Sequence, residues 1–196
     1  TIPAARDIPY PGTIKLEVDA TRINQAIYRV KETIPVAGAG PMALLMPQWL
    51  PGKHAPRGEI EKLAGLTITA NGQRLAWRRD PLDVYAFHID VPAGVREVIV
   101  TFEFLSATQP NQGRVVVTPD MLNLQWEAVS LYPAGYFTRQ IPVEATVTYP
   151  DGWTAASGLP ATREGAVYRY EKTDYETLVD SPVFAGRYFR EWKLSD

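Results

Sequence analysis

Histidine and cysteine, the residue types most often used for metal binding and nucleophilic catalysis, are scarce in this chain. Its 196 residues contain no Cys and only two His, His54 and His88. A zinc site needs three or four His, Cys or carboxylate ligands, and a Ser–His–Asp triad needs a His beside an activated Ser. Neither an H-E-x-x-H nor a G-x-S-x-G motif is present. The sequence therefore predicts no catalytic residue and no metal site here, with only a site of two His and a carboxylate assembled across strands left open.

The segment 46–58 has a composition unusual for a connection between strands. Its sequence, MPQWLPGKHAPRG, places three prolines and two glycines around Trp49. Proline fixes φ and removes a backbone donor, so this loop is expected to be stiff and shaped. It is either a packed corner of the fold or a surface presented to another domain or ligand.

A second segment, Leu124–Ala128, carries two polar groups beside a tryptophan. Gln125 and Glu127 flank Trp126, and in an extended strand they would lie on the same side. The plain interpretation is the polar face of an edge strand. The functional interpretation is a carboxylate placed to accept a ligand ammonium.

Charge and hydropathy exclude several classes of partner. The chain has 20 Lys+Arg against 22 Asp+Glu, a net charge of −2, and 45% hydrophobic residues. Such a balance gives no electrostatic footprint for nucleic acid or anionic membranes, and no apolar run approaches the ~18 residues that a membrane span requires. The sequence therefore predicts an ordinary globular domain that binds neither nucleic acid nor membrane.

The elements that must position these residues are predicted to be strands. Residues 14–19 alternate apolar and polar side chains, and Asn71-Gly72 between two such runs is typical of a hairpin turn. Further runs, among them 84–91, 97–104 and 121–128, recur at roughly 8–12-residue spacing. One short helix is predicted around Arg57–Ala64. The predicted fold is all-β, an antiparallel β-sandwich or open barrel-like sheet pair with about a dozen strands and little helix.

Three motifs resemble the glycyl aminopeptidase family. Pro47-x-Trp49-x-Pro51-Gly52, followed by Arg57, resembles that family's P-x-W-x-P-G-S-Y-x-x-R signature, although Lys53-His54 replaces Ser-Tyr and Gly58-Glu59 replaces an acidic-aromatic pair. Residues 149–159, YPDGWTAASGL, resemble a P-x-x-W-x-x-A-T-G-L strand and turn. Residues 175–183, YETLVDSPV, resemble the Y-D-x-L-V-D-S-P-V that leads into the catalytic domain.

Members of that family are zinc metallopeptidases with an N-terminal β domain, a thermolysin-like catalytic domain and a PDZ domain. The resemblance implies that residues 1–183 are the N-terminal β-sandwich domain and that 184–196 are a final strand or lead-in to the catalytic domain. It implies no activity from this part alone, with zinc held by a catalytic domain in cis. Trp49, Pro51, Gly52 and Arg57 are the expected inter-domain surface. The family's tendency toward export favours a periplasmic or secreted location, with the cytoplasm as the alternative.

A more distant likeness, carried by Leu124–Ala128 and by TAAS at 154–157, extends to aminopeptidase N relatives. In these relatives the acidic residue of Q-x-E-A binds the α-ammonium of the substrate. The resemblance implies that Glu127, with Gln125 beside it, binds the N-terminus of a peptide substrate.

Two alternatives of another class remain open at this stage. Five Trp and ten Tyr would suit a carbohydrate-binding β-sandwich, with Trp126, Trp77 or Trp49 as stacking platforms. A free-standing adhesion or assembly module is the other. A glycosidase also stays open, because its paired catalytic carboxylates cannot be located from sequence alone.

Overall fold

The largest element of the computed structural model, which describes residues 1–50, 52–56 and 58–194, is a nine-stranded sheet. Its strand order is β13-β14-β11-β1-β2-β8-β4-β5, and β15 also pairs with β11. The strands are β1 (Ile14–Asp19), β2 (Ile27–Pro35), β4 (Leu63–Ala70), β5 (Gln73–Leu75), β8 (Glu97–Leu105), β11 (Pro142–Thr148), β13 (Ala161–Glu164), β14 (Val167–Tyr170) and β15 (Thr173–Asp174).

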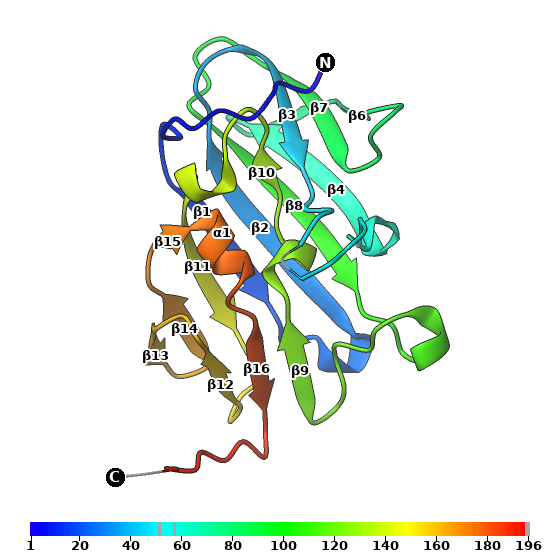
Figure 1. Cartoon of the computed structure of the whole chain (residues 1–196), viewed down its shortest axis with the longest axis vertical. Coiled ribbons are helices and arrows are strands. Elements are labelled where there is room, and N and C mark those ends of the chain that lie inside the picture. The colour runs from blue at the N-terminus through cyan, green and yellow to red at the C-terminus, as the bar shows by residue number, and fades with distance from the viewer. Residues whose placement is uncertain (51, 57, 195–196) are drawn as a thin grey trace.

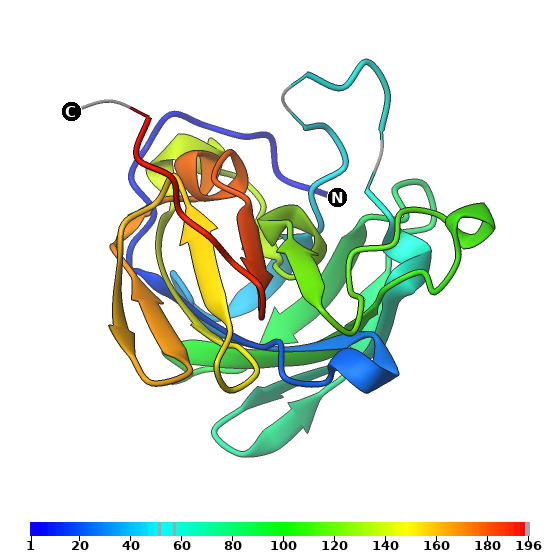
Figure 2. The same ribbon diagram turned by 90° about the horizontal axis from the view of Figure 1, so that it is seen from below.

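Two smaller sheets lie over one face of this large sheet (Figure 1 and Figure 2). The four-stranded sheet has the order β10-β3-β7-β6, and the three-stranded sheet has the order β12-β16-β9. Their strands are β3 (Gly40–Leu45), β6 (Trp77–Arg79), β7 (Ala86–Val91), β9 (Met121–Leu124), β10 (Tyr132–Pro133), β12 (Thr154–Ser157) and β16 (Val183–Gly186).

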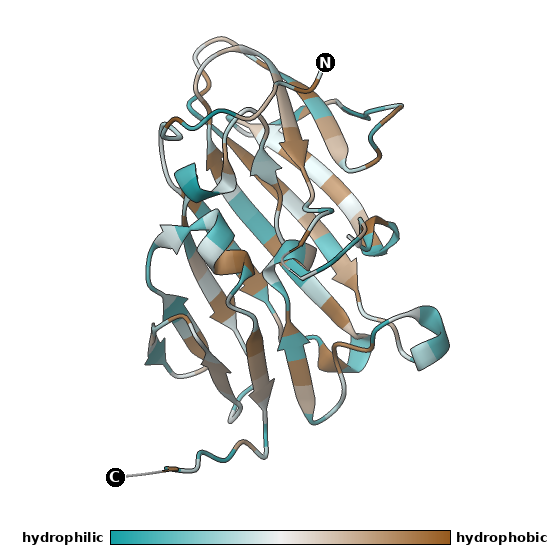
Figure 3. Ribbon diagram, in the orientation of Figure 1, coloured by the Kyte–Doolittle hydropathy of each residue, from teal (hydrophilic) through white to brown (hydrophobic). Residues whose placement is uncertain are grey.

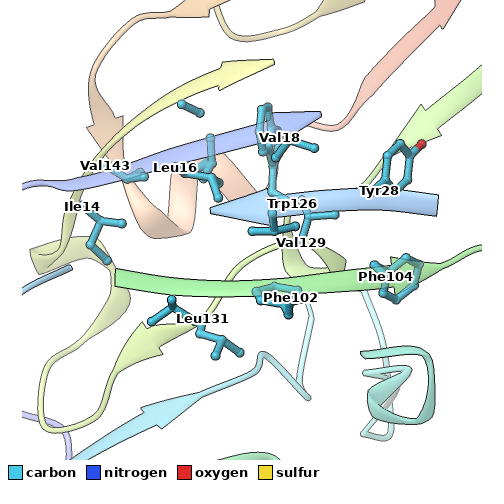
Figure 4. Close-up of a cluster of buried hydrophobic side chains, with 14 of the residues drawn as sticks. Ile14, Leu16, Val18, Tyr28, Phe102, Phe104, Trp126, Val129, Leu131 and Val143 are labelled. Atoms are coloured by element: carbon cyan, nitrogen blue, oxygen red, sulfur yellow. The ribbon is translucent and has the colours of Figure 1, made fainter. Parts of the chain in front are cut away.

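The core lies between these layers because the large sheet alternates along its strands. In β1, Ile14, Leu16 and Val18 are buried while Lys15 and Glu17 are exposed. The same alternation shows as changing hydropathy along the central strands (Figure 3). Side chains from β1, β2, β8 and β11 meet those of the segment 126–131 in one apolar cluster (Figure 4). Burial of this apolar area, at about 25 cal/mol per Å², is the main force that holds the layers together.

The predicted all-β class is confirmed, with two differences in detail. The pairing of β1 with β11 is parallel, whereas every other pairing between the described strands is antiparallel. The described residues form 16 strands rather than about a dozen, and four of these are only two or three residues long. Such short strands carry too few alternating positions to be seen in the sequence.

The helical prediction was wrong in its position. Within the described part of the predicted range 57–64, residues 58–64, the helical structure is a 3-10 turn, η2 (Ile60–Lys62), because strand β4 begins at Leu63. The α-helix is α1 (Tyr175–Val179), capped by Asp174, whose Oδ1 accepts from Thr177 N at 2.9 Å. The other 3-10 turns are η1 (Ile23–Gln25), η3 (Pro110–Gln112), η4 (Trp126–Ala128) and η5 (Thr138–Gln140). Among the described residues, no helix is both long and apolar enough to cross a membrane.

Candidate functional site

A cleft of about 580 Å³ lies between three segments that are far apart in sequence. They are the proline-rich loop that follows β3, the loop that precedes β9, and the turn η4. The described parts of this loop, 46–50, 52–56 and 58–59, stand out from the sheets beside this turn (Figure 2). The described lining residues are Met46, Leu50, Gly52, Lys53, His54, Ala55, Gly58, Glu59, Arg114, Gln125, Glu127 and Ala128.

The turn that carries Gln125 and Glu127 is anchored by Trp126. This side chain is fully buried, and its Nε1 donates to Ser181 O at 2.7 Å. The Ser130 hydroxyl closes the turn by donating to Trp126 O at 2.5 Å. With Trp126 held in the core, its two neighbours both line the cleft.

The local backbone differs from the predicted strand over 121–128. Strand β9 ends at Leu124, and the next residues form η4. Gln125 and Glu127 nevertheless line the same cleft, although they do not share a strand. The same geometry removes Trp126 as a sugar-stacking platform, since its ring has no exposed face.

Glu127 is a half-buried carboxylate in a mixed electrostatic setting. With the Gln125 amide oriented to satisfy its neighbours, Gln125 Nε2 donates to Glu127 Oε1 at 3.0 Å and Gln125 Oε1 accepts from the Arg114 guanidinium. Burial raises the pKa of Glu127, while its own backbone N–H and the charges of Arg114 and Lys53 act in the opposite direction.

Glu59, the other carboxylate that lines the cleft, is already in an ion pair. Lys62 Nζ lies 2.5 Å from Glu59 Oε1, and the Lys62 side chain is largely buried. Glu59 is thus paired within the fold. Glu127, by contrast, is held by an amide, so it is the carboxylate of this cleft best suited to accept an external cation.

The described residues do not suit a zinc ion. They contain no group of three or more His, Cys, Asp or Glu side chains that could hold a metal. His54 lines the cleft, but His88 lies on β7, where its Nε2 is 2.7 Å from Asp80 Oδ2. A zinc ion in the intact protein would need ligands from outside these residues.

The residues predicted to form the inter-domain surface do not all lie in the cleft. Gly52 lines the cleft together with Gln125 and Glu127, whereas Trp49 is 61% exposed and is not among the lining residues. Pro51 and Arg57 lie outside the described residues. The inter-domain role of this set stays a prediction.

Sequence reasoning missed Arg114 as a member of the site. Arg114 lies in the connection between η3 and β9, outside the described strands. Its approach to Gln125 depends on how two loops fold back on each other, and no local pattern encodes that. One sequence feature could have identified Lys53 and His54 as site residues: they are the positions at which the loop departs from the P-x-W-x-P-G-S-Y motif.

The chain belongs to the family described as the peptidase M61 N-terminal domain, whose match covers residues 15–187. This confirms the resemblance stated from its motifs. A search of curated protein sequences found no match.

Solved structures show the same fold at low sequence identity. An aminopeptidase N family protein from Idiomarina loihiensis has a TM-score of 0.72 and 17% identity, over 89% of this chain and 29% of that one. Yeast LTA4 hydrolase in complex with bestatin has a TM-score of 0.52 and 11% identity, over 92% and 28%. An M1 zinc metallopeptidase from Deinococcus radiodurans bound to a Tyr-Ser-Ala substrate has a TM-score of 0.50 and 11% identity, over 92% and 42%. The chain therefore spans less than half of each of these proteins.

Proposed function

We propose that this chain is the non-catalytic N-terminal domain of a zinc-dependent aminopeptidase. In this proposal it packs against the catalytic domain in cis and shapes the part of the cleft that receives the substrate's N-terminus. Family membership supports the domain assignment. The absence of a metal-binding group among the described residues fits a division of labour in which zinc, and the activation of water by zinc, belong to the catalytic domain.

The observation that carries the proposal is the placement of Glu127. Its carboxylate is half-buried, shares a cleft with Lys53 and Arg114, and is held by the Gln125 amide. Partial burial makes the carboxylate costly to ionise without a counter-charge, as the raised pKa reflects. A peptide's α-ammonium supplies both the charge and three N–H donors, so it would satisfy this carboxylate well.

The test compares substrates with free and blocked N-termini in the full-length enzyme. Glu127→Ala should raise KM for an unblocked peptide by about 10- to 100-fold, the loss expected for one charge-assisted hydrogen bond. The KM for the N-acetylated form of the same peptide should change little, because it carries no ammonium.

The matched control is Glu164→Ala, which removes an exposed carboxylate from the edge strand β13. Both substrates should keep their kinetic constants in this variant. An equal effect of Glu127→Ala on blocked and unblocked peptides would show that Glu127 does not recognise the ammonium.

A further inference from the structure

Strand β16 (Val183–Gly186) is apolar on both of its faces. Val183 and Ala185 point into the core and are buried, as expected for alternate residues of a strand. Phe184, between them, points the other way and is 51% exposed. A strand with one face in water normally places polar residues on that face, whereas strands covered on both sides read as continuous apolar runs.

The neighbouring chain extends this apolar surface. The register places Gly186 opposite Met121 of β9, and Met121 is 52% exposed. Tyr188 and Phe189, which follow β16 after Arg187, are 74% and 38% exposed. Strands β9 and β16 lie side by side at the end of the molecule from which the chain runs on toward its C-terminus (Figure 1).

Met121, Phe184, Tyr188 and Phe189 line one shallow groove of about 270 Å³, here called the β9–β16 patch. Its edge carries an ion pair, Arg187 Nε to Asp120 Oδ1 at 3.3 Å, and Arg187 Nη2 also donates to Pro119 O at 3.0 Å. Aromatic residues, Met and Arg around an apolar centre, with charges at the rim, make up the composition of protein–protein interfaces.

We infer that the β9–β16 patch is the surface on which the catalytic domain docks in cis. The inference rests on the proposed function for the identity of the occupant. It names a surface distinct from the cleft that holds Glu127, because none of the four patch residues lines that cleft.

Two observations favour an occupant in cis. The family is by description the N-terminal part of a peptidase, so the rest of such a protein follows the last strand, β16. The segment after β16 passes beside the patch and is itself apolar at the exposed Trp192 and Leu194. A domain that continues from this segment meets the patch at a very high effective concentration, which favours docking even through a small surface.

The test measures thiol accessibility in the native full-length protein, and it needs no enzymatic activity. Phe184→Cys and Met121→Cys place one probe on each strand of the patch, in a domain that has no native Cys. Leu82→Cys is the matched control, since Leu82 is 95% exposed in the turn before β7. Labelling by a small maleimide is followed at each position by peptide mass spectrometry.

Both patch positions should react at least about tenfold more slowly than Leu82→Cys in the native protein and equally fast in denaturant. The slow rate should not change on dilution, because a domain in cis stays attached. Rapid labelling at either patch position would overturn the inference. Protection that disappears on dilution would also overturn it, since a second copy would then cover the patch.

The two proposals fail separately. If Glu127→Ala affects blocked and unblocked peptides equally while the patch cysteines stay protected, the docking surface stands and the ammonium site does not. If one cysteine variant does not fold, the other patch position decides the outcome by itself.

Discussion

Glu32 is the most unusual side chain of the core. It lies on β2 at an inward position, between the buried Val30 and Ile34, and is itself fully buried. Its Oε1 accepts from Leu131 N at 2.7 Å, while Oε2 has no hydrogen-bond partner among the described residues. This carboxyl group ties the large sheet to the segment that follows the Glu127 turn. An isolated buried carboxylate is costly, so burial favours the protonated form of Glu32 in the fold.

Burial raises the pKa of Glu32 well above its ordinary value of 4.5, and the hydrogen bond from Leu131 opposes this only in part. The folded state therefore holds the proton more tightly than the unfolded state does. Below the pKa of Glu32 in the unfolded state, this effect contributes its full amount to the stability of the fold. The contribution is lost as the pH rises from there to the higher pKa of Glu32 in the folded state.

Glu32→Gln keeps the acceptor for Leu131 N but cannot ionise. As the pH rises above about 4.5, the free energy of unfolding of the parent should therefore fall relative to that of this variant. The difference should grow by up to about 1.4 kcal/mol per pH unit. Urea unfolding at a series of pH values measures the difference. A constant difference between the two proteins from pH 4 to 8 would contradict a raised pKa.

Glu32→Leu provides the matched contrast at the same position. It removes the charge and also the acceptor, which leaves the Leu131 N–H buried without a partner. That loss should cost about 1–3 kcal/mol relative to Glu32→Gln. Faster amide exchange at Leu131 in Glu32→Leu than in Glu32→Gln would locate the effect.

Among the elements, the hairpin of β4 and β5 follows most directly from the sequence. Asn71 and Gly72 adopt φ values of 48° and 75°, as the predicted two-residue turn requires. Asn tolerates this left-handed region better than most residues, and Gly enters it without strain. The local sequence is sufficient here because a two-residue turn depends on only two backbone conformations.

Gly72→Ala should destabilise the domain by about 1–2 kcal/mol, because a Cβ at positive φ is strained even though no atom lies near it. Gly38→Ala is the matched control: its surroundings are equally open, but its φ lies outside the left-handed range. Thermal unfolding compares the two. Equal unfolding temperatures for the two variants would show that an added Cβ does not strain the turn.

Other elements depended on contacts that a local pattern does not contain. The pairing of β1 with β11 joins segments more than 100 residues apart, and its parallel direction is decided by how the layers close. The turn η4 ends β9 early because Trp126 inserts into the core and hydrogen-bonds to Ser181. Helix α1 lies in a segment whose sequence pattern predicts no helix, although Asp174, three residues before Thr177, is a typical N-cap residue.

At the scale of the whole molecule, the proposed function predicts which part of the protein carries the activity. In that proposal the catalytic residues lie in another domain, so the purified chain should hydrolyse no peptide with or without added zinc. A fluorogenic aminopeptidase assay with and without zinc measures this, and the full-length protein serves as the positive control. Zinc-dependent turnover by the chain alone would contradict the proposed non-catalytic role.

The sequence by itself determined the all-β class, the Asn71-Gly72 hairpin, the scarcity of metal ligands and the family. These follow from local alternation, turn chemistry, composition and contiguous motifs. Only the tertiary structure decided that Arg114 meets Gln125 beside Glu127, that Glu32 supports the backbone at Leu131, and that β16 presents Phe184 to the surface. The physical reason is that each of these depends on segments far apart in the chain, which are brought together by burial of the shared core.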